Sequence, residues 1–503
     1  MSTVVAVTDA THRKSRLRLS RFEGLLRYGR TPVDGASLAF FRIAFGLILA
    51  FAPARFLAND WVTRFFVEPR FYFKYWGFAW IEVLSPNLMH AAFVLLVFLG
   101  LCVTLGLFYR LAAFVYLLVF TYVELIDVTN YLNHYYLVSL LCFWLAILPL
   151  NKVGSIETYF ASQTRDTSLP RWALLALRFQ VGIVYLNAGL AKFGPDWLIQ
   201  GEPLSIWLAA RTETPVIGRF FDEPGMALAM SWGGFLFDTT IPFWLSIRRT
   251  RLWAFGAVVV FHSLTGALFN IGLFPWIMVA SASVFLGERW PRQMGHWLQA
   301  SRLGRAWRAG KGRDHFRFES TAATSRAYRA RPAFWDSLAR SMLALFALAQ
   351  ILIPLRSHLY GGNVLWHEQG MRWSWRVMVR EKNGSVMYRV LYDGSTRERL
   401  IAPSRYLTAH QEREMSGQPD LILQLAHQIR DDLQDRGHRN VQVRVHALVS
   451  LNGRPARPMV DPQIDLSKVS DGLMPATYVT PFASSAPFAS SSLRSAIVRT
   501  HAI

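Results

Sequence analysis

Two polar residues lie side by side in one of the most apolar parts of the chain, the segment YLNHYYLVSLL at residues 131–141. A bilayer core has no water, so a polar group without a partner costs several kcal/mol there. Asn133 and His134 are therefore either hydrogen-bond partners of a neighbouring helix or members of a functional site. The residue types alone leave both interpretations open.

Three further ionisable side chains interrupt apolar runs: Lys192 in NAGLAKFGPDW, Asp238 in WGGFLFD and His262 in FGAVVVFHSLTGALFN. Each has an ordinary structural explanation. Lys192 could extend to lipid headgroups from a helix end, and Asp238 could pair with a histidine where helices pack. Trp197, shortly after the lysine, could belong to an interfacial aromatic belt.

The composition is that of a membrane protein, with 52% hydrophobic and only 17% charged residues; soluble chains carry about 25% charged residues. The net charge of +21 is concentrated in short blocks between apolar runs. Such blocks are typical of topology signals and argue against a nucleic-acid partner. Cys102 and Cys142 both lie in apolar runs and form neither a disulfide framework nor a metal motif. No short apolar core with a cleavage site follows the basic N-terminus, so we expect the first span to be an uncleaved anchor.

Apolar runs of spanning length predict about nine transmembrane helices. They are expected at about 36–58, 88–108, 111–128, 131–150, 172–193, 227–246, twice within 252–287, where Gly272 and Pro275 mark a turn, and at 336–356. The sequence thus predicts a polytopic α-helical membrane domain followed by an extramembrane β-rich domain.

Positive charge predicts the orientation of these spans. Residues 11–30 hold seven Lys or Arg, and residues 288–335 hold eleven against three acidic residues. Both segments are therefore expected in the cytoplasm. An alternative for 288–335, a basic patch on anionic lipid, is also cytoplasmic. Nine spans then place the C-terminal domain outside the cytoplasm, on the far side of a plasma or inner membrane.

Alternating polarity and turn signals predict the domain after the last span. Asn383-Gly384, Asp393-Gly394 and Asn452-Gly453 indicate hairpin turns, and PDLILQLAHQIRDDLQDRG indicates a helix between the strand pairs. The tail contains PFASSAPFASSS, which is typical of disorder. The expected boundaries are 1–35 for a basic cytoplasmic N-terminus, 36–287 for the membrane domain, 288–335 for a basic cytoplasmic loop, 336–356 for the last span, 357–467 for the external β-rich domain and 468–503 for the disordered tail.

This orientation places four ionisable side chains at a similar depth, close beneath the external domain: His134, Lys192, Asp238 and His262. Shared depth favours a site over four separate structural explanations. Apolar surroundings favour the neutral amine of a lysine over its ammonium ion, which makes it a usable base. An amine base at the membrane surface suits an acidic, lipid-soluble substrate such as a quinol.

Five segments together resemble the vitamin K-dependent γ-glutamyl carboxylase family in its bacterial-type form. The membrane part of that family is also known as the horizontally transferred transmembrane (HTTM) domain. The similar segments are YLNHYYLVSLL, YLNAGLAKFGPDW, FHSLTGALFNIGLFPWIMVASASVFLGERWPR, WSWRVMVR and VSLNGRPARPMVDPQIDL. The similarity runs in order from about residue 36 to residue 467.

The resemblance implies an enzyme that oxidises reduced vitamin K, a naphthohydroquinone, with O2 and couples this to carboxylation of glutamyl side chains by CO2, without a metal. Lys192 would deprotonate the quinol, and His134 with Asn133 would hold the reacting glutamyl side chain of a peptide or protein. The cofactor would lie among Asn133 and the residues at its depth: His262, Asp238 and Trp197. Membrane lipid is the other expected partner.

The same resemblance implies that Ser374 and Trp375 line the site from the external side, with Arg380 closing that segment. Trp373 and Trp375 are expected on one face of a strand and Ser374 on the other.

Two departures from the family pattern affect function. Ala191 replaces the first of two adjacent lysines, which leaves the base at Lys192 in place, and Arg380 replaces a histidine concerned with the glutamate step. One alternative is therefore a quinol-oxidising membrane enzyme without protein carboxylation. Another is a nonenzymatic HTTM protein whose β-rich domain binds a partner.

Overall fold

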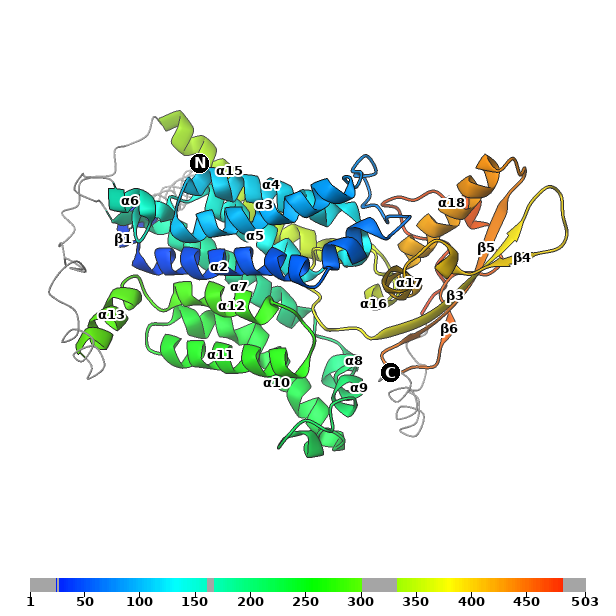
Figure 1. Cartoon of the computed structure of the whole chain (residues 1–503). Helices are drawn as coiled ribbons and strands as arrows, with labels where there is room; N and C mark the ends of the chain where they lie inside the picture. The colour runs from blue at the N-terminus through cyan, green and yellow to red at the C-terminus, as the bar shows by residue number, and fades with distance from the viewer. Residues whose placement is uncertain (1–23, 25–26, 161–166, 301–332, 483–503) are drawn as a thin grey trace, which may run out of the picture.

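The computed structural model describes residues 24, 27–160, 167–300 and 333–482. Figure 1 shows long helices lying side by side, with a small sheet and its helices covering one end of the bundle. We call residues 357–482 the sheet region and the covered end the sheet-side end. The long helices of the bundle are α2 (Ala36–Ala58), α3 (Pro86–Leu105), α4 (Tyr109–Ile126), α5 (Asn133–Ile147), α7 (Arg171–Leu190), α10 (Pro224–Ser246), α11 (Arg251–Leu268), α12 (Phe274–Ala282) and α15 (Ala333–Leu355).

Shorter elements connect the long helices. Two three-residue strands pair antiparallel at the end of the bundle away from the sheet region. The short elements of the bundle are β1 (Pro32–Asp34), α6 (Ile156–Phe160), β2 (Ser168–Pro170), α8 (Pro195–Leu198), α9 (Leu204–Ala209) and α13 (Trp290–Ala300).

Helix ends follow local sequence signals. α3 begins with Pro86 directly after Ser85, because proline has no N–H to lose in the first turn. It ends before Gly106, which adopts a left-handed φ of 66°, the usual conformation after a helix.

Among the described residues, six helices are long and apolar enough to cross a membrane: α2, α3, α4, α7, α11 and the stretch Ser341–Leu359. The chain is therefore an integral membrane protein. Each of the other predicted spans also coincides with a helix. However, α5 and the stretch Phe274–Phe285 are shorter, and α10 is not among the six. The count of nine spans stays a prediction.

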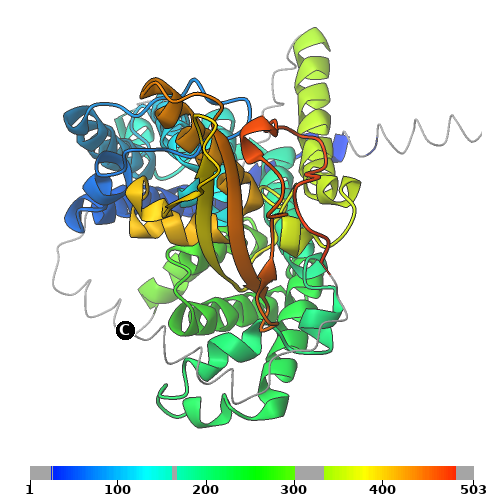
Figure 2. The same cartoon turned by 90° about the vertical axis from the view of Figure 1, so that its right-hand side faces the viewer.

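The sheet region holds a four-stranded antiparallel sheet in the order β4-β3-β5-β6. β3 and β5 pair along their whole lengths, from Lys382 opposite Leu451 to Leu391 opposite Gln442, and Figure 2 shows them lying across the end of the bundle. The elements are α16 (Val364–His367), β3 (Lys382–Leu391), β4 (Arg399–Ile401), α17 (Ala409–Ser416), α18 (Pro419–Asp435), β5 (Gln442–Leu451) and β6 (Arg457–Pro458).

The turn signals gave two correct predictions and one wrong one. Asp393 and Asn452 have left-handed φ values of 54° and 49° and follow β3 and β5, so both turns are confirmed. The expected helix is α18. Asn383-Gly384 is no turn, because both residues lie inside β3 opposite Ser450 and Val449.

The segment before β3 also differs from the prediction. Residues 371–375 form turns, so no strand places two indoles on one face. Trp373, Trp375 and Met378 have positive φ values of 61°, 59° and 55°. Because of these left-handed residues, the segment crosses the end of the bundle without forming a helix or a strand.

The expected disordered tail begins too early. Residues 468–482 are an ordered part of the sheet region, since Tyr478 is buried and Val479 forms a β-bridge with Val460. The low-complexity stretch after residue 482 lies outside the described residues.

An ionic clamp joins the sheet region to the loop after α7. Arg454 donates from Nη1 and Nη2 to the two carboxylate oxygens of Asp196, at 2.8 and 2.6 Å. Asn452 donates to the same carboxylate at 2.9 Å. On another side, Gln411 of α17 donates to Asp127 at 2.7 Å. Two separate contacts therefore fix the sheet region on the bundle.

We predict that Arg454→Ala lowers the free energy of unfolding by about 2 kcal/mol, because it removes charge-assisted hydrogen bonds from a partly buried carboxylate. Thermal unfolding in detergent measures this change, with Arg457→Ala in β6 as the matched control. Equal stability of the two variants would show that the clamp does not hold the sheet region.

Candidate functional site

Lys192 follows the C-terminal end of α7 and points at α10. Its Nζ donates to Asp238 Oδ2 at 2.8 Å and to the carbonyl oxygen of Ala188 at 3.1 Å. The ammonium also lies 5.4 Å from the ring centre of Trp197. Both members of the ion pair are buried, with side chains only 7% and 8% exposed. Lys192 is therefore no snorkelling residue in this structure but a member of an internal ion pair.

Close packing of α7 on α10 sets the geometry of this pair. A Cβ atom on Gly189 would lie 2.5 Å from Thr239 Cγ2 and 2.8 Å from the backbone nitrogen of Thr239. Only glycine allows the two backbones to approach this closely. The approach places Lys192, three residues after Gly189, within hydrogen-bonding distance of Asp238, which directly precedes Thr239.

A second polar pair lies near the first. The hydroxyl of Tyr185 and Nε2 of His262 are 2.8 Å apart, which links α7 to α11. The other ring nitrogen of His262, Nδ1, is buried without a hydrogen-bond partner among the described residues. An orphaned buried nitrogen is unfavourable by itself and is available to a ligand.

These residues line a cavity of about 260 Å³ at the sheet-side end. Its walls are almost entirely apolar, apart from the polar groups of Lys192, Asp238, Tyr185, His262 and Thr265. The remaining lining residues include Trp197, Met230, Phe261, Phe269, Phe274 and Met278. An apolar cavity with a few polar groups is the usual form of a small-molecule site.

The sheet region contributes two residues to the cavity. Val377 and Met378 reach the lining from the irregular segment before β3. The sheet region therefore completes part of the cavity wall.

His134 lies outside this cavity, separated from it by one aromatic ring. Phe274 is 5.9 Å from His134 and 5.9 Å from His262, measured between ring centres. Gly272, with a left-handed φ of 59°, faces the imidazole: a Cβ there would lie 3.7 Å from His134 Nε2 and 3.9 Å from Arg55 Nη2. The turn between α11 and α12 thus brings a histidine and an arginine together beside the cavity.

Asn133 begins α5 and has a structural contact. Its Oδ1 accepts a hydrogen bond from Tyr131 at 3.1 Å, and the hydroxyl of Tyr131 accepts one from the backbone nitrogen of Trp373 at 2.7 Å. Asn133 therefore connects the bundle to the sheet region, and neither it nor His134 touches the cavity lining.

Ser374 and Trp375 also lie away from the lining. Ser374 donates to the carbonyl oxygen of Met371, and Trp375 is buried and stacks on Tyr136 with ring centres 4.9 Å apart. Val377 and Met378, a few residues further along the same segment, line the cavity where Ser374 and Trp375 were expected.

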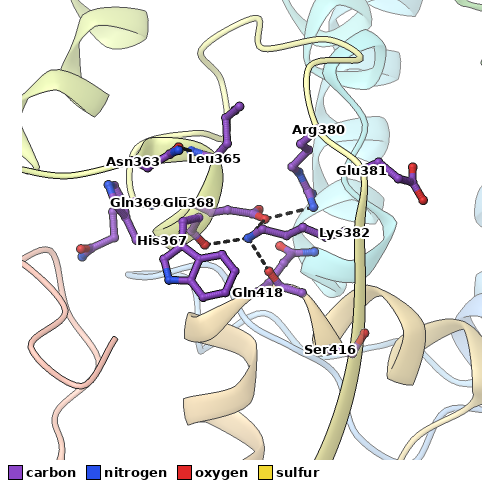
Figure 3. A network of polar contacts seen from close by, with 12 residues as sticks. Asn363, Leu365, His367, Glu368, Gln369, Arg380, Glu381, Lys382, Ser416 and Gln418 are labelled. Atoms are coloured by element: carbon purple, nitrogen blue, oxygen red, sulfur yellow. Dashed lines mark hydrogen bonds and ion pairs between the residues drawn. The ribbon is translucent and has the colours of Figure 1, made fainter. Parts of the chain in front are cut away.

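Arg380 belongs to a charged cluster at the start of β3 (Figure 3). Glu368 accepts from Arg380 at 3.0 Å and from Lys382 at 2.8 Å. Lys382 also donates to the carbonyl oxygens of Trp366 and Gly417. Burial lowers the pKa of Lys382 to about 8, and the negative charge of Glu368 opposes this shift. Arg380 is therefore held by a carboxylate of the same chain.

The structure thus brings together Lys192, Asp238, His262 and Trp197 in the wall of one cavity. The other expected site residues lie outside its lining. Sequence reasoning missed Tyr185, Val377 and Met378. Helical periodicity offered a signal for Tyr185, because it precedes Ala188 and Lys192 by about one and two turns on the same face of α7. Nothing in the pattern marked Val377 or Met378.

Fold and cavity define a helical membrane protein whose C-terminal sheet region completes a small-molecule cavity. Comparison with known families gives two matches: the HTTM domain over residues 30–290, and the vitamin K-dependent gamma-carboxylase lumenal domain over residues 335–485. The chain belongs to the vitamin K-dependent gamma-carboxylase family. No solved structure matches the chain.

We predict that Gly189→Ala lowers the free energy of unfolding by about 1 to 3 kcal/mol, because the added methyl group collides with α10. Gly182→Ala on the same helix is the control, since its nearest contact would be an ordinary 3.7 Å. Thermal unfolding of both variants measures the difference, and equal stability would mean that α7 and α10 are not in close contact.

Proposed function

We propose that the chain is a vitamin K-dependent γ-carboxylase that works in the cavity beside Lys192. It would couple the oxidation of reduced vitamin K by O2 to the carboxylation of glutamyl side chains by CO2. The observation that carries the proposal is a lysine amine, 2.8 Å from Asp238, in the wall of an otherwise apolar cavity of about 260 Å³.

The residues present fit a naphthoquinol ring. Phe261, Phe269 and Phe274 supply flat apolar contacts for a bicyclic ring. Lys192 offers a hydrogen-bonding group to one ring oxygen, and the orphaned Nδ1 of His262 offers another. The hydroxyl of Tyr185 fixes the orientation of the imidazole.

Lys192 would remove the proton of a ring hydroxyl by a relay: its ammonium passes one proton to the carboxylate of Asp238, 2.8 Å away, and the resulting amine takes the proton of the quinol. The restored ammonium then lies beside the new ring oxyanion, where the opposite charge stabilises it without rearrangement. Trp197 presents its ring face to the same cation. Asp238 thus positions Lys192 and takes up the transferred proton, and Lys192 is the base that meets the quinol hydroxyl.

Bound reduced vitamin K, through its reaction with O2, supplies the strong base that removes a γ-proton from a glutamyl side chain, after which CO2 adds. Val377 and Met378 exclude water from the sheet-side face of the cavity, which protects a strongly basic species. His134 and Arg55 lie beside Gly272, one ring away from the cavity, and would hold the glutamyl carboxylate. A glutamate-containing peptide would approach on the sheet-side face, which we place outside the cytoplasm.

A second candidate function, quinol oxidation without protein carboxylation, is favoured by one observation. Arg380 replaces a family histidine and is paired with Glu368 at 3.0 Å instead of lining the cavity. The glutamate step would then lack one of its groups, while the base and the quinol cavity remain. Incorporation of labelled CO2 into a glutamyl peptide separates the two candidates.

We predict that Lys192→Ala abolishes the formation of vitamin K epoxide in an inserted, folded protein. Lys192→Arg should be equally inactive, because a guanidinium does not give up its proton in proteins. Epoxide produced from reduced vitamin K by the purified protein is the measurement, and Lys468→Ala, whose side chain is 76% exposed, is the control. Wild-type epoxide formation by the alanine variant would contradict the proposed base, and its absence from the wild-type protein would favour a nonenzymatic role.

We predict that His134→Ala separates the two halves of the reaction. Epoxide should still form, because His134 does not line the quinol cavity, while fixed CO2 should fall at least tenfold. Both products are measured in the same purified sample, with His90→Ala at the start of α3 as the control. Equal loss of both products, parallel to a loss of folded protein, would make His134 a packing residue worth about 1 kcal/mol.

A further inference from the structure

A second cavity lies on the other side of His134, and the mechanism above does not use it. Its volume is about 240 Å³, close to that of the first. It is bounded by the sheet-side ends of α2, α3 and α4, by residues 129–132 and by α17 of the sheet region. Its apolar lining is largely aromatic and includes Phe56, Phe65, Phe66, Phe93, Tyr116 and Phe120.

Three polar groups open on this cavity without partners. Glu124 of α4 and the hydroxyl of Tyr135 form no hydrogen bond or ion pair with any described residue. Nε2 of His410, on α17, is buried and also lacks a partner within the described part of the chain. A carboxyl group at this position in a membrane helix is costly unless it serves a ligand.

A short row of aromatic rings lies between the two cavities. Tyr135 lines the second cavity, and its ring centre lies 4.7 Å from that of His134. On the other side His134 contacts Phe274, which lines the first cavity. Tyr135, His134 and Phe274 thus lie in a row between the two cavities.

We propose that the second cavity is a separate binding site for a quinone or hydroquinone ring. Such a ring is flat and apolar, with an oxygen at each of two edges, which matches aromatic walls with a few polar groups from different elements. Glu124, as a neutral carboxylic acid, would donate a hydrogen bond to one ring oxygen from the membrane bundle, and His410 would donate to the other from the sheet region. Burial lowers the pKa of His410, so its neutral imidazole can donate to or accept from the ligand.

Other ligand classes fit the lining less well. A fatty acid would bring its carboxylate against Glu124 and Glu414. An alkylammonium group would suit Glu124, but Arg413 lines the same cavity and lies 3.3 Å from Glu414, whose charge it balances. The unpartnered Nε2 of His410 also offers nothing to a cation when this nitrogen itself carries the proton.

The test is the binding stoichiometry of menadione, 2-methyl-1,4-naphthoquinone, measured by equilibrium dialysis with the purified full-length protein in detergent. Binding of the oxidised ring needs neither O2 nor catalysis. We expect two equivalents per chain for the wild type. Glu124→Leu and His410→Leu should each lose one, while Glu124→Gln should retain both, because an amide still forms the hydrogen bond.

The controls separate the two sites. Glu82→Leu, whose side chain is 77% exposed at the same end of the bundle, should bind two equivalents. Gly233→Trp, which fills the first cavity from α10, should bind one, and that one should disappear when Glu124→Leu is added. Lys192→Ala should not change occupancy of the second site.

A single equivalent in the wild type that is lost in Gly233→Trp would overturn the second site and leave the first intact. Two equivalents in both Glu124→Leu and His410→Leu would also overturn it. Loss of the second equivalent in Glu124→Gln would contradict the hydrogen bond assigned to Glu124, because the amide can still donate to a ring oxygen, and would overturn the site as described. Failure of epoxide formation with two equivalents bound would contradict the proposed reaction but not this site.

Discussion

A lysine and an aspartate buried in apolar surroundings must remain in contact, because an uncompensated charge there costs several kcal/mol. Lys192 and Asp238 meet this condition at 2.8 Å, and the packing around them maintains it. Gly189 lets α7 approach α10, and the ring of Trp197 lies beneath the amine. The same arrangement leaves the amine at the wall of a cavity, where a quinol hydroxyl would meet it. The packing of α7 on α10 and the proposed deprotonation of the quinol therefore depend on the same ion pair.

The sheet region completes this arrangement at the sheet-side end of the bundle. The clamp between Arg454 and Asp196 holds it over the loop that follows Lys192. Left-handed residues before β3 then direct Met378 into the cavity. The cavity lies where the two parts of the chain meet, so the proposed base works at a boundary to which both parts contribute residues.

Much of this was predictable from the sequence. Apolar runs located the helices, and isolated ionisable residues in those runs identified Lys192, Asp238 and His262 as neighbours.

The sequence pattern gave wrong predictions where tertiary contacts override local signals. Asn383-Gly384 reads as a turn, yet the pair continues β3 because Ser416 of α17 packs directly against Gly384. His134 shares the depth of the other residues, but depth does not specify direction, and Phe274 stands between it and the cavity. The positions of Val377 and Met378 depend on left-handed backbone that no residue type signalled.

The most direct test is an experimental structure of the purified protein with reduced menadione bound under anaerobic conditions. We expect the ring in the cavity between α7, α10 and α11, with one ring oxygen within hydrogen-bonding distance of Lys192 Nζ and the other near His262. A ring bound elsewhere, with this cavity empty and Lys192 contacting only Asp238, would contradict the assignment of Lys192 as the base.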